Sequence, residues 1–230
     1  MPPNWIVLIP AHNEEKQIAN IVRQALAHLP VLVVDDGSSD PTAALAEEAG
    51  AQVIRQSPNQ GKGVALNTGF AWALQQDYEA VLTLDGDGQH DPAEIPKFLA
   101  AGAQGADLII GVRDFSQMPL VRKAANSLGT IVLSWALGQQ VPDNQSGYRL
   151  IGKRVMQAML ASREVGFEFE VEMIVLAVQR GFTIGWVPIR TIYEGGASHI
   201  QPLKHLVNFI RKALWTRQQI RKNATDEGVE

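Results

Sequence analysis

The strongest constraint on the fold is a regular alternation of short, β-prone apolar runs with amphipathic stretches over the first two thirds of the chain. This alternation is typical of a mainly parallel sheet that is covered by helices. The expected strands are 5–10, 31–35, 51–55, 80–85 and 107–111. The sequence therefore predicts an α/β fold with a Rossmann-like, mainly parallel sheet and helices on both faces.

Capping signals mark three helices between these strands. Apolar residues from 18 to 29 keep helical spacing, and Asn13 is placed to cap the helix that they form. The other two are expected to begin at Asp40-Pro41 and Asp91-Pro92 and to end at Gly50 and Gly102. Beyond about residue 119 the alternation weakens. There we expect helices at 120–137, 153–160 and 168–180, then an apolar run at 182–189.

Composition excludes several classes of protein. The 230 residues suit one domain, or one domain with an appendage, and 46% hydrophobic against 19% charged residues is typical of a globular chain. The absence of cysteine excludes disulfides, thiolate metal sites and cysteine nucleophiles, and it fits a reducing cytosol. No segment approaches the roughly 18 uninterrupted apolar residues of a spanning helix, and residues 1–4 carry no secretory leader. We therefore expect a cytoplasmic protein that does not cross a membrane by itself.

Charge is distributed unevenly along the chain. Residues 1–195 are acidic overall, whereas residues 196–222 contain six Lys/Arg and no acid. Within 203–217 the apolar side chains lie near one helical stripe opposite a basic face, as in helices that lie in a bilayer interface. The alternative is docking onto the protein's own domain or a second subunit. We divide the chain into a main domain at 1–195 and, at 196–230, a basic amphipathic helix with a short acidic tail.

Polar residues gather after three of the predicted strands. His12-Asn13-Glu14 follows the first, Asp35-Asp36-Gly37-Ser38 the second, and the segment from Asp85 to Gln89 the fourth. Ligands of open α/β sheets lie at the carboxyl ends of the strands, so we expect these clusters to form one site. Nucleic acid is not the expected ligand, because the body is acidic and its basic residues are not interleaved with aromatics.

Asp85 and Asp87 are one residue apart after an apolar run, so both side chains can point the same way. Carboxylates placed like this, together with substrate phosphates, are how proteins typically hold Mg²⁺ or Mn²⁺. The alternative is an Asp/Gly turn without a ligand, and Asp91 before Pro92 is expected to be a helix cap. The convergence of three clusters favours a cation and a diphosphate-bearing substrate.

Five motifs occur in a fixed order within residues 5–195. They are Ile9-Pro10-Ala11-His12-Asn13-Glu14, Val34-Asp35-Asp36-Gly37-Ser38-Ser39-Asp40, Asn59-Gln60-Gly61-Lys62-Gly63, Asp85-Gly86-Asp87-Gly88-Gln89-His90 and Ser146-Gly147-Tyr148-Arg149. In this order they resemble family 2 glycosyltransferases, and in particular the polyprenyl-phosphate branch with the dolichyl-phosphate mannose synthases. The resemblance implies an A-type glycosyltransferase fold, with residues 1–195 as the catalytic domain. It also implies metal-dependent, inverting transfer of a sugar from GDP-mannose or a UDP-sugar to a polyprenyl phosphate.

The resemblance further implies which residues hold the nucleotide sugar. They are Pro10, Ala11, Glu14, Asp36, Lys62, Asp85 and Gly86. A carboxylate at Asp36 suits an imino N–H of the base or a ribose hydroxyl, because an ionised acceptor strengthens a hydrogen bond. Lys62, between two glycines before a helix, could meet a phosphate or the ribose. The alternative for Glu14 is an acidic residue in the first turn of a helix, where the helix dipole favours it. The alternative for Lys62 is a solvated lysine in a loop.

Asp85, Asp87 and Gln89 match the metal-binding positions of that branch, where Mg²⁺ or Mn²⁺ would act as a Lewis acid on the diphosphate. His90 is a weaker ligand candidate. Its alternative is a loop histidine that makes one backbone hydrogen bond.

Arg113 and Arg122 resemble arginines that the branch uses on the diphosphate and the acceptor phosphate, because guanidinium groups bind phosphate oxygens bidentately. For Arg122 the alternative is a position on the solvent-exposed face of a helix. Family members that act on sugar hydroxyls use a carboxylate as the base, and Asp143 is the residue nearest to that position in this sequence. A phosphate monoester is mostly dianionic near pH 7, since its second pKa is about 6, so it needs positioning more than deprotonation. Together with Asp87, these residues form the expected catalytic set.

The sequence also bears on other functions. A nucleotidyltransferase should carry a Gly/Arg-rich loop after its first strand, and Pro10-Ala11-His12-Asn13-Glu14 argues against it. A glycosyltransferase that uses Asp143 as base on a sugar hydroxyl, and a non-catalytic nucleotide-sugar-binding protein, stay open at this point.

Overall fold

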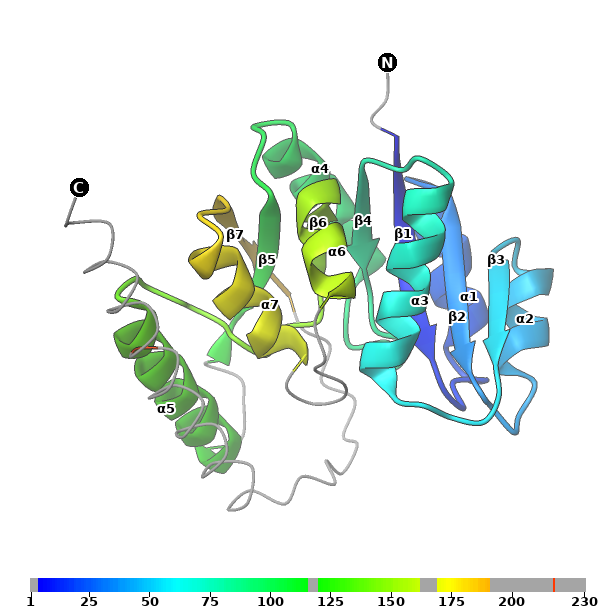
Figure 1. The fold of residues 1–230 in the computed structure, drawn as a ribbon. Coiled ribbons are helices and arrows are strands. Elements are labelled where there is room, and N and C mark those ends of the chain that lie inside the picture. The colour runs from blue at the N-terminus through cyan, green and yellow to red at the C-terminus, as the bar shows by residue number, and fades with distance from the viewer. Residues whose placement is uncertain (1–3, 116–119, 162–168, 191–216, 218–230) are drawn as a thin grey trace.

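The computed structural model describes residues 4–115, 120–161, 169–190 and 217 (Figure 1). In these residues one seven-stranded sheet has the order β3-β2-β1-β4-β6-β5-β7. The strands are β1 (Trp5–Ala11), β2 (Val31–Asp36), β3 (Gln52–Gln56), β4 (Ala80–Thr83), β5 (Leu108–Arg113), β6 (Arg149–Gly152) and β7 (Ile184–Ile189). The helices are α1 (Ile18–Leu26), α2 (Thr42–Glu48), α3 (Lys62–Gln75), the 3₁₀ turn η1 (Pro92–Glu94), α4 (Ile95–Gly102), α5 (Leu120–Leu137), α6 (Lys153–Leu160) and α7 (Phe169–Gln179). The predicted α/β fold is confirmed.

The sheet is mainly parallel, as predicted, with one exception. Strand β6 lies between β4 and β5 and is antiparallel to both. The other adjacent pairs, β1 with β2 and β4, β2 with β3, and β5 with β7, are parallel. Four-residue β6 is too short for a period of two to stand out from its surroundings, and the sequence pattern did not predict it.

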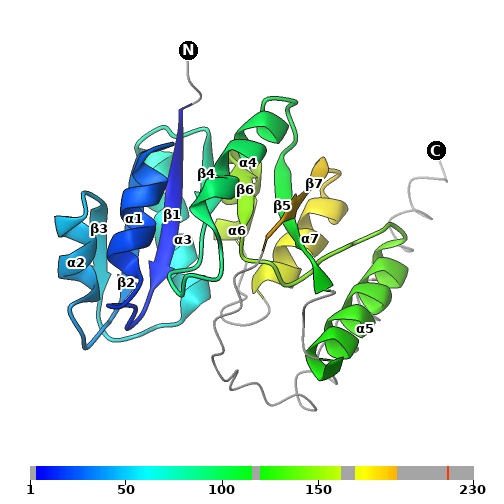
Figure 2. The ribbon, with the colours of Figure 1, turned by 180° about the vertical axis from the view of Figure 1, so that it is seen from behind.

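Successive strand residues point to opposite faces of the sheet, so these apolar strands present an apolar surface on both faces. Helices cover each of them. Ile6 and Leu8 of β1 face α3, α6 and α7 (Figure 1). Val7 and Ile9 face α1 and α4, which lie in front in Figure 2. Strands buried on both faces read as continuous apolar runs, which explains why β1 and β2 were recognisable in the sequence.

Two of the expected helix caps form. The Asp91 carboxylate accepts a hydrogen bond from the Ala93 N–H (2.9 Å), and that of Asp40 accepts from the Thr42 N–H (3.0 Å). The cap expected at Asn13 is wrong. Helix α1 starts later, at Ile18, and Asn13 lies in the left-handed region (φ 58°) with its amide bound to the second strand's loop. The C-terminal helix predicted at 196–222 lies outside the described residues, apart from Arg217.

Candidate active site

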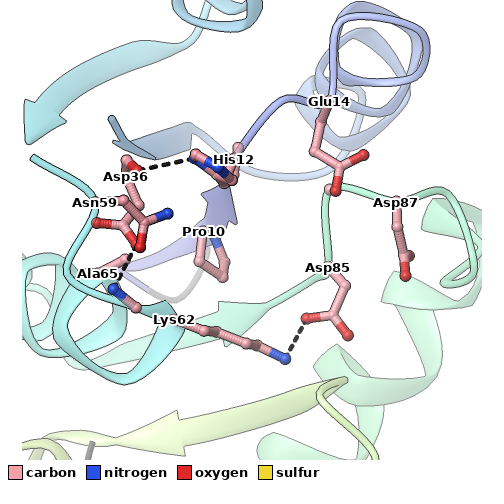
Figure 3. Close-up of a pocket in the computed structure, with 12 residues that line it drawn as sticks. Pro10, His12, Glu14, Asp36, Asn59, Lys62, Ala65, Asp85 and Asp87 are labelled. Carbon is pink, nitrogen blue, oxygen red and sulfur yellow. Dashed lines mark hydrogen bonds and ion pairs between the residues drawn. The ribbon is translucent and has the colours of Figure 1, made fainter. Parts of the chain in front are cut away.

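The carboxyl ends of β1 and β2, the loop after β4 and the start of α3 surround a cleft of about 270 Å³ (Figure 3). It is lined by Pro10, Ala11, His12, Glu14, Asp36, Asn59, Gly61, Lys62, Ala65, Asp85, Gly86 and Asp87. Parallel strands end at one edge of a sheet, so the three polar clusters of the sequence share this cleft. All seven residues expected to hold the nucleotide sugar are in its lining.

Asp36 organises the loop that precedes α3. Its carboxylate is almost fully buried and accepts hydrogen bonds from the N–H groups of Gln60 (2.9 Å) and Gly61 (2.7 Å). Gly61 has a φ of 95°, a conformation that favours glycine, and Lys62 follows as the first residue of α3. By holding the backbone of Gln60 and Gly61, Asp36 fixes the backbone position of Lys62.

His12 is held in one orientation by hydrogen bonds at both ring nitrogens. Nδ1 lies 3.0 Å from the Asp36 carbonyl oxygen, which can only accept, so Nδ1 carries the proton. Nε2 then accepts from the Asn13 side-chain amide (3.1 Å), whose oxygen accepts from the Ser39 N–H (2.8 Å). Both ring nitrogens are thus engaged in hydrogen bonds, and the ring is a fixed part of the cleft wall.

Lys62 bridges two carboxylates. Its Nζ lies 2.7 Å from Asp85 Oδ1 and 2.9 Å from Glu170 Oε1, and Figure 3 shows the lysine extended toward Asp85. Burial works to lower the pKa of Lys62, but the two carboxylates outweigh it and raise that pKa above its ordinary value. Burial likewise works to raise the pKa of Asp85, and the charge of Lys62 brings it down to about 2. Asp85 is therefore ionised at neutral pH.

Three carboxylates converge on one side of the cleft. Burial, followed by the negative charges of Asp87 and Asp85, raises the pKa of Glu14 to about 7. Figure 3 shows Glu14, Asp85 and Asp87 on the same side of the pocket. Such mutual repulsion between acids is relieved by a bound cation.

Hydrogen bonds within the loop 85–91 set the direction of its carboxylates. The Asp85 N–H donates to Nδ1 of buried His90 (3.1 Å), so the predicted alternative for His90, a single backbone hydrogen bond, is what forms. The Gln89 amide donates to Asp87 Oδ2 (2.6 Å), and its N–H donates to Asp87 Oδ1 (2.9 Å). Below the loop the His90 ring packs on Tyr148 with centroids 5.1 Å apart.

The donor set fits a hard divalent cation. Within the described part of the chain no group of three or more His, Asp or Glu side chains forms a complete metal cage. Mg²⁺ sites of nucleotide enzymes typically use one or two carboxylates and take their remaining ligands from phosphates and water. Asp85 and Asp87 supply such a pair, facing a cleft that also contains Lys62. In this structure Gln89 holds Asp87, and its role as a metal ligand stays a prediction.

Arg113 and Asp143 form a buried pair beside this cleft. Arg113 Nε and Nη2 lie 2.7 and 2.9 Å from the two Asp143 oxygens. Asp143 is fully buried and also accepts from the N–H groups of Arg113, Gln145 and Ser146. Both carboxylate oxygens of Asp143 thus accept hydrogen bonds from within the protein.

The loop that follows Asp143 packs against the carboxylate of Asp85. A Cβ added to Gly147 would lie 2.7 Å from Asp85 Oδ2, so glycine is needed for this close approach. Arg149 is buried and donates to three carbonyl oxygens, those of Ser146 (2.7 Å), Glu170 (2.6 Å) and Asn144 (3.4 Å). This guanidinium therefore ties the loop to the start of α7.

Several site residues were not given a role from the sequence, including Gly61 and Ala65 of the cleft lining. His12 and Asn59 line the cleft, and Glu170 binds Lys62. His12 and Asn59 lie inside the motifs listed above, so the sequence indicated that they belong to the site. No feature of the sequence indicated Glu170. Arg113 and Asp143 lie outside the cleft lining and bind each other, and the side chain of Arg122, in α5, lies outside the described residues.

A sequence model described as "Glycosyl transferase family 2" matches residues 6–165. The chain is 32% identical over 200 residues to the polyprenol monophosphomannose synthase of Mycolicibacterium smegmatis, covering 80% of this chain and 76% of that one. It is 31% identical over 214 residues to a UDP-N-acetylglucosamine–dolichyl-phosphate N-acetylglucosaminyltransferase of Methanococcus voltae, covering 81% and 85%.

A solved structure shares the fold. Glucosyl-3-phosphoglycerate synthase from Mycobacterium tuberculosis, in complex with Mn²⁺, uridine diphosphate and phosphoglyceric acid, matches with a TM-score of 0.69 at 19% identity. The match covers 92% of this chain and 76% of that chain.

Proposed function

The chain belongs to glycosyl transferase family 2, and we propose that it transfers a sugar from a nucleoside-diphosphate sugar to a polyprenyl phosphate with the help of Mg²⁺ or Mn²⁺. The observation that carries this proposal is the convergence of Asp36, Lys62, Asp85 and Asp87 on one cleft. The relatives named for polyprenol and dolichyl phosphate acceptors support the acceptor class. The Mn²⁺ and uridine diphosphate bound by the glucosyl-3-phosphoglycerate synthase support the cation and the donor class.

The nucleoside lies against the wall formed by Pro10, Ala11 and Asp36. The two backbone hydrogen bonds to Asp36 leave lone pairs on its oxygens, and these accept from the base or the ribose. A carboxylate held so rigidly recognises its ligand without further loss of conformational freedom.

The diphosphate lies between Lys62 and the Asp85–Asp87 loop. Asp85 and Asp87 would hold the cation, which would supply Lewis-acid stabilisation to the diphosphate leaving group. Lys62 has Glu170 as a second counter-ion, so its ammonium can turn to a phosphate oxygen without leaving every carboxylate. Lys62 thus adds a positive charge where negative charge develops.

In this proposal Arg113 and Arg122 bind the acceptor phosphate. One of its oxygens attacks the anomeric carbon directly as the bond from that carbon to the donor diphosphate breaks, so the configuration inverts and the nucleoside diphosphate leaves. A dianionic phosphate needs no strong base. Full burial of Asp143 and its five accepted hydrogen bonds support a role in positioning Arg113 and the loop 143–147, not in proton removal. The alternative acceptor, a sugar hydroxyl with Asp143 as base, is correspondingly disfavoured.

The test is a transfer assay that offers GDP-mannose, UDP-glucose or UDP-N-acetylglucosamine, each with a short-chain polyprenyl phosphate and Mg²⁺, Mn²⁺ or EDTA. We expect lipid-linked sugar from one donor and none in EDTA. Asp87→Asn serves as the inactive reference. A protein that binds nucleotide diphosphate yet neither transfers nor hydrolyses any donor would be a non-catalytic nucleotide-sugar binder, and the proposal would be wrong.

A further inference from the structure

The start of α7 brings a carboxylate to Lys62 from outside the cleft. Glu170 lies in the first turn of that helix, where the helix dipole favours an acid, and its Oε1 is 2.9 Å from the Lys62 Nζ. The Glu170 side chain is only 12% exposed. The lining of the cleft includes Lys62 and Asp85 but not Glu170. Glu170 therefore reaches the site through Lys62.

Two contacts hold Glu170 in place. The buried Arg149 guanidinium donates a hydrogen bond to the Glu170 carbonyl oxygen (2.6 Å). The preceding residue, Phe169, is fully buried and packs against Phe70 of α3, with ring centroids 6.2 Å apart. Helices α3 and α7 cover the same face of the sheet (Figure 1), so this aromatic contact joins the helix that carries Glu170 to the helix that begins at Lys62. Packing thus sets the position of the carboxylate.

Lys62 is restrained at both ends. Asp36 fixes its backbone position through the preceding loop. At the other end, the ammonium lies between Asp85 Oδ1 (2.7 Å) and Glu170 Oε1 (2.9 Å). An ammonium has three N–H donors, so these two carboxylates leave one for a phosphate oxygen in the cleft that Lys62 lines.

A cation and Lys62 would compete for Asp85. The ammonium already lies against Asp85 Oδ1, and a divalent cation held by Asp85 and Asp87 would bring a second positive charge to the same carboxylate. Like charges at such short range repel. With Glu170 present, the ammonium keeps a counter-ion of its own, so Asp85 can give its charge to the cation.

Formal charge leads to the same conclusion. The three carboxylates of Asp85, Asp87 and Glu170, together with the Lys62 ammonium, balance the charge of one divalent cation. Without Glu170, the remaining two carboxylates and the ammonium fall one charge short. The cation would then bind to a less negative site.

We propose that Glu170 is a positioning residue of this site, whose carboxylate holds the Lys62 ammonium at the diphosphate when a cation takes up the charge of Asp85. The inference rests on the proposed function for what the cleft binds. It adds a residue of α7 to a site whose lining comes from β1, β2, the start of α3 and the loops beside them. Glu170 acts through Lys62 and contacts neither the cation nor the donor.

Mn²⁺ titration followed by electron paramagnetic resonance tests this role, first with Mn²⁺ alone and then with uridine or guanosine diphosphate. We expect Glu170→Gln to weaken Mn²⁺ binding about tenfold, because Lys62 is then left to Asp85 and competes with the cation. Glu94→Gln is the matched control. It makes the same change at a carboxylate that is 7% exposed and paired with Lys97 outside the cleft, and it should bind Mn²⁺ like the wild type.

A second background separates positioning from a structural effect. Lys62→Met removes the competing ammonium, so we expect it to bind Mn²⁺ at least as tightly as the wild type. Within Lys62→Met, the further change Glu170→Gln should weaken Mn²⁺ binding less than about twofold, because its effect depends on Lys62. Equal losses in the two backgrounds, or no loss in either, would overturn the role. So would a loss in Glu94→Gln as large as that in Glu170→Gln.

Sugar transfer separates this inference from the proposed function. In Glu170→Gln we expect the Mn²⁺ concentration for half-maximal transfer to rise, and excess Mn²⁺ to restore much of the rate. Mn²⁺ affinity that depends on Glu170 in a chain that transfers no sugar overturns the function and keeps the positioning role. Sugar transfer by a chain whose Mn²⁺ affinity is unchanged in Glu170→Gln overturns the positioning role and keeps the function.

Discussion

The donor and acceptor sides of the site are built by different physical means. On the donor side, carboxylates at the ends of parallel strands accept hydrogen bonds from backbone N–H groups, as Asp36 does from Gln60 and Gly61. On the acceptor side, charged side chains satisfy each other inside the protein, as Arg113 and Asp143 do. The donor-side charges, including the paired Lys62 and Asp85, thus line the cleft, whereas Arg113 and Asp143 bind each other outside its lining. Substitutions on the two sides should fail in different ways.

The largest effect is expected on the donor side. Asp85→Asn and Asp87→Asn each remove a carboxylate from the cleft, and we expect sugar transfer to fall about 10³-fold, because a cation supplies several kcal/mol to the transition state. Steady-state kinetics with saturating donor measures the loss. Mn²⁺ titration followed by electron paramagnetic resonance should show weaker binding in both variants, and unchanged Mn²⁺ affinity would refute their assignment as ligands.

A smaller effect, with a distinct signature, is expected on the acceptor side. Arg113→Met and Asp143→Asn each break the buried pair, and we expect kcat/KM to fall about 10²-fold in either, since one partner is left unpaired. The double variant should lose little more than a single one, because residues that act as a unit are not additive. Additive losses, with the greater one in Asp143→Asn, would instead indicate that Asp143 is a base.

The same contrast explains what could be predicted from the sequence. The cleft clusters follow strands of continuous apolar residues, and parallel strands end at one edge, so Asp36 and Asp85 could be brought together from the pattern alone. Arg113 and Asp143 could be named from the family resemblance but not paired, because their contact depends on the inserted antiparallel strand β6. Glu170 could not be found, since only tertiary packing brings the start of α7 to Lys62.

An intermediate effect is expected at His90, which connects the two sides. His90→Phe keeps an aromatic ring against Tyr148 but removes the acceptor for the Asp85 N–H, and we expect Mn²⁺ affinity to fall about tenfold, as for other groups that orient metal ligands. His90→Asn places an amide oxygen near the position of Nδ1 and should restore most of that affinity. Calorimetric titration of Mn²⁺ in the presence of uridine or guanosine diphosphate measures both. Equal losses in the two variants would mean that ring packing, not the hydrogen bond, matters.

The smallest effect concerns the pH dependence of stability, set by Glu14. Its pKa of about 7 in the folded protein exceeds the ordinary value of 4.5, so between these pH values the folded state binds more protons than the unfolded state. Stability contributed by this group is therefore present below about pH 4.5 and is lost as the pH rises to about 7. In EDTA, we expect the thermal midpoint to fall less steeply over this range in Glu14→Gln than in the wild type.

Glu15→Gln is the matched control, because it makes the same change at an exposed neighbour and should keep the wild-type slope. Adding Mn²⁺ to the wild type should flatten the slope as well, since a cation held by Asp85 and Asp87 offsets the charges that raise the Glu14 pKa. A Glu14→Gln slope equal to that of the wild type would mean that neither burial nor the two neighbouring carboxylates raise the pKa of Glu14. The donor side would then lack the concentration of negative charge that distinguishes it from the internally paired acceptor side.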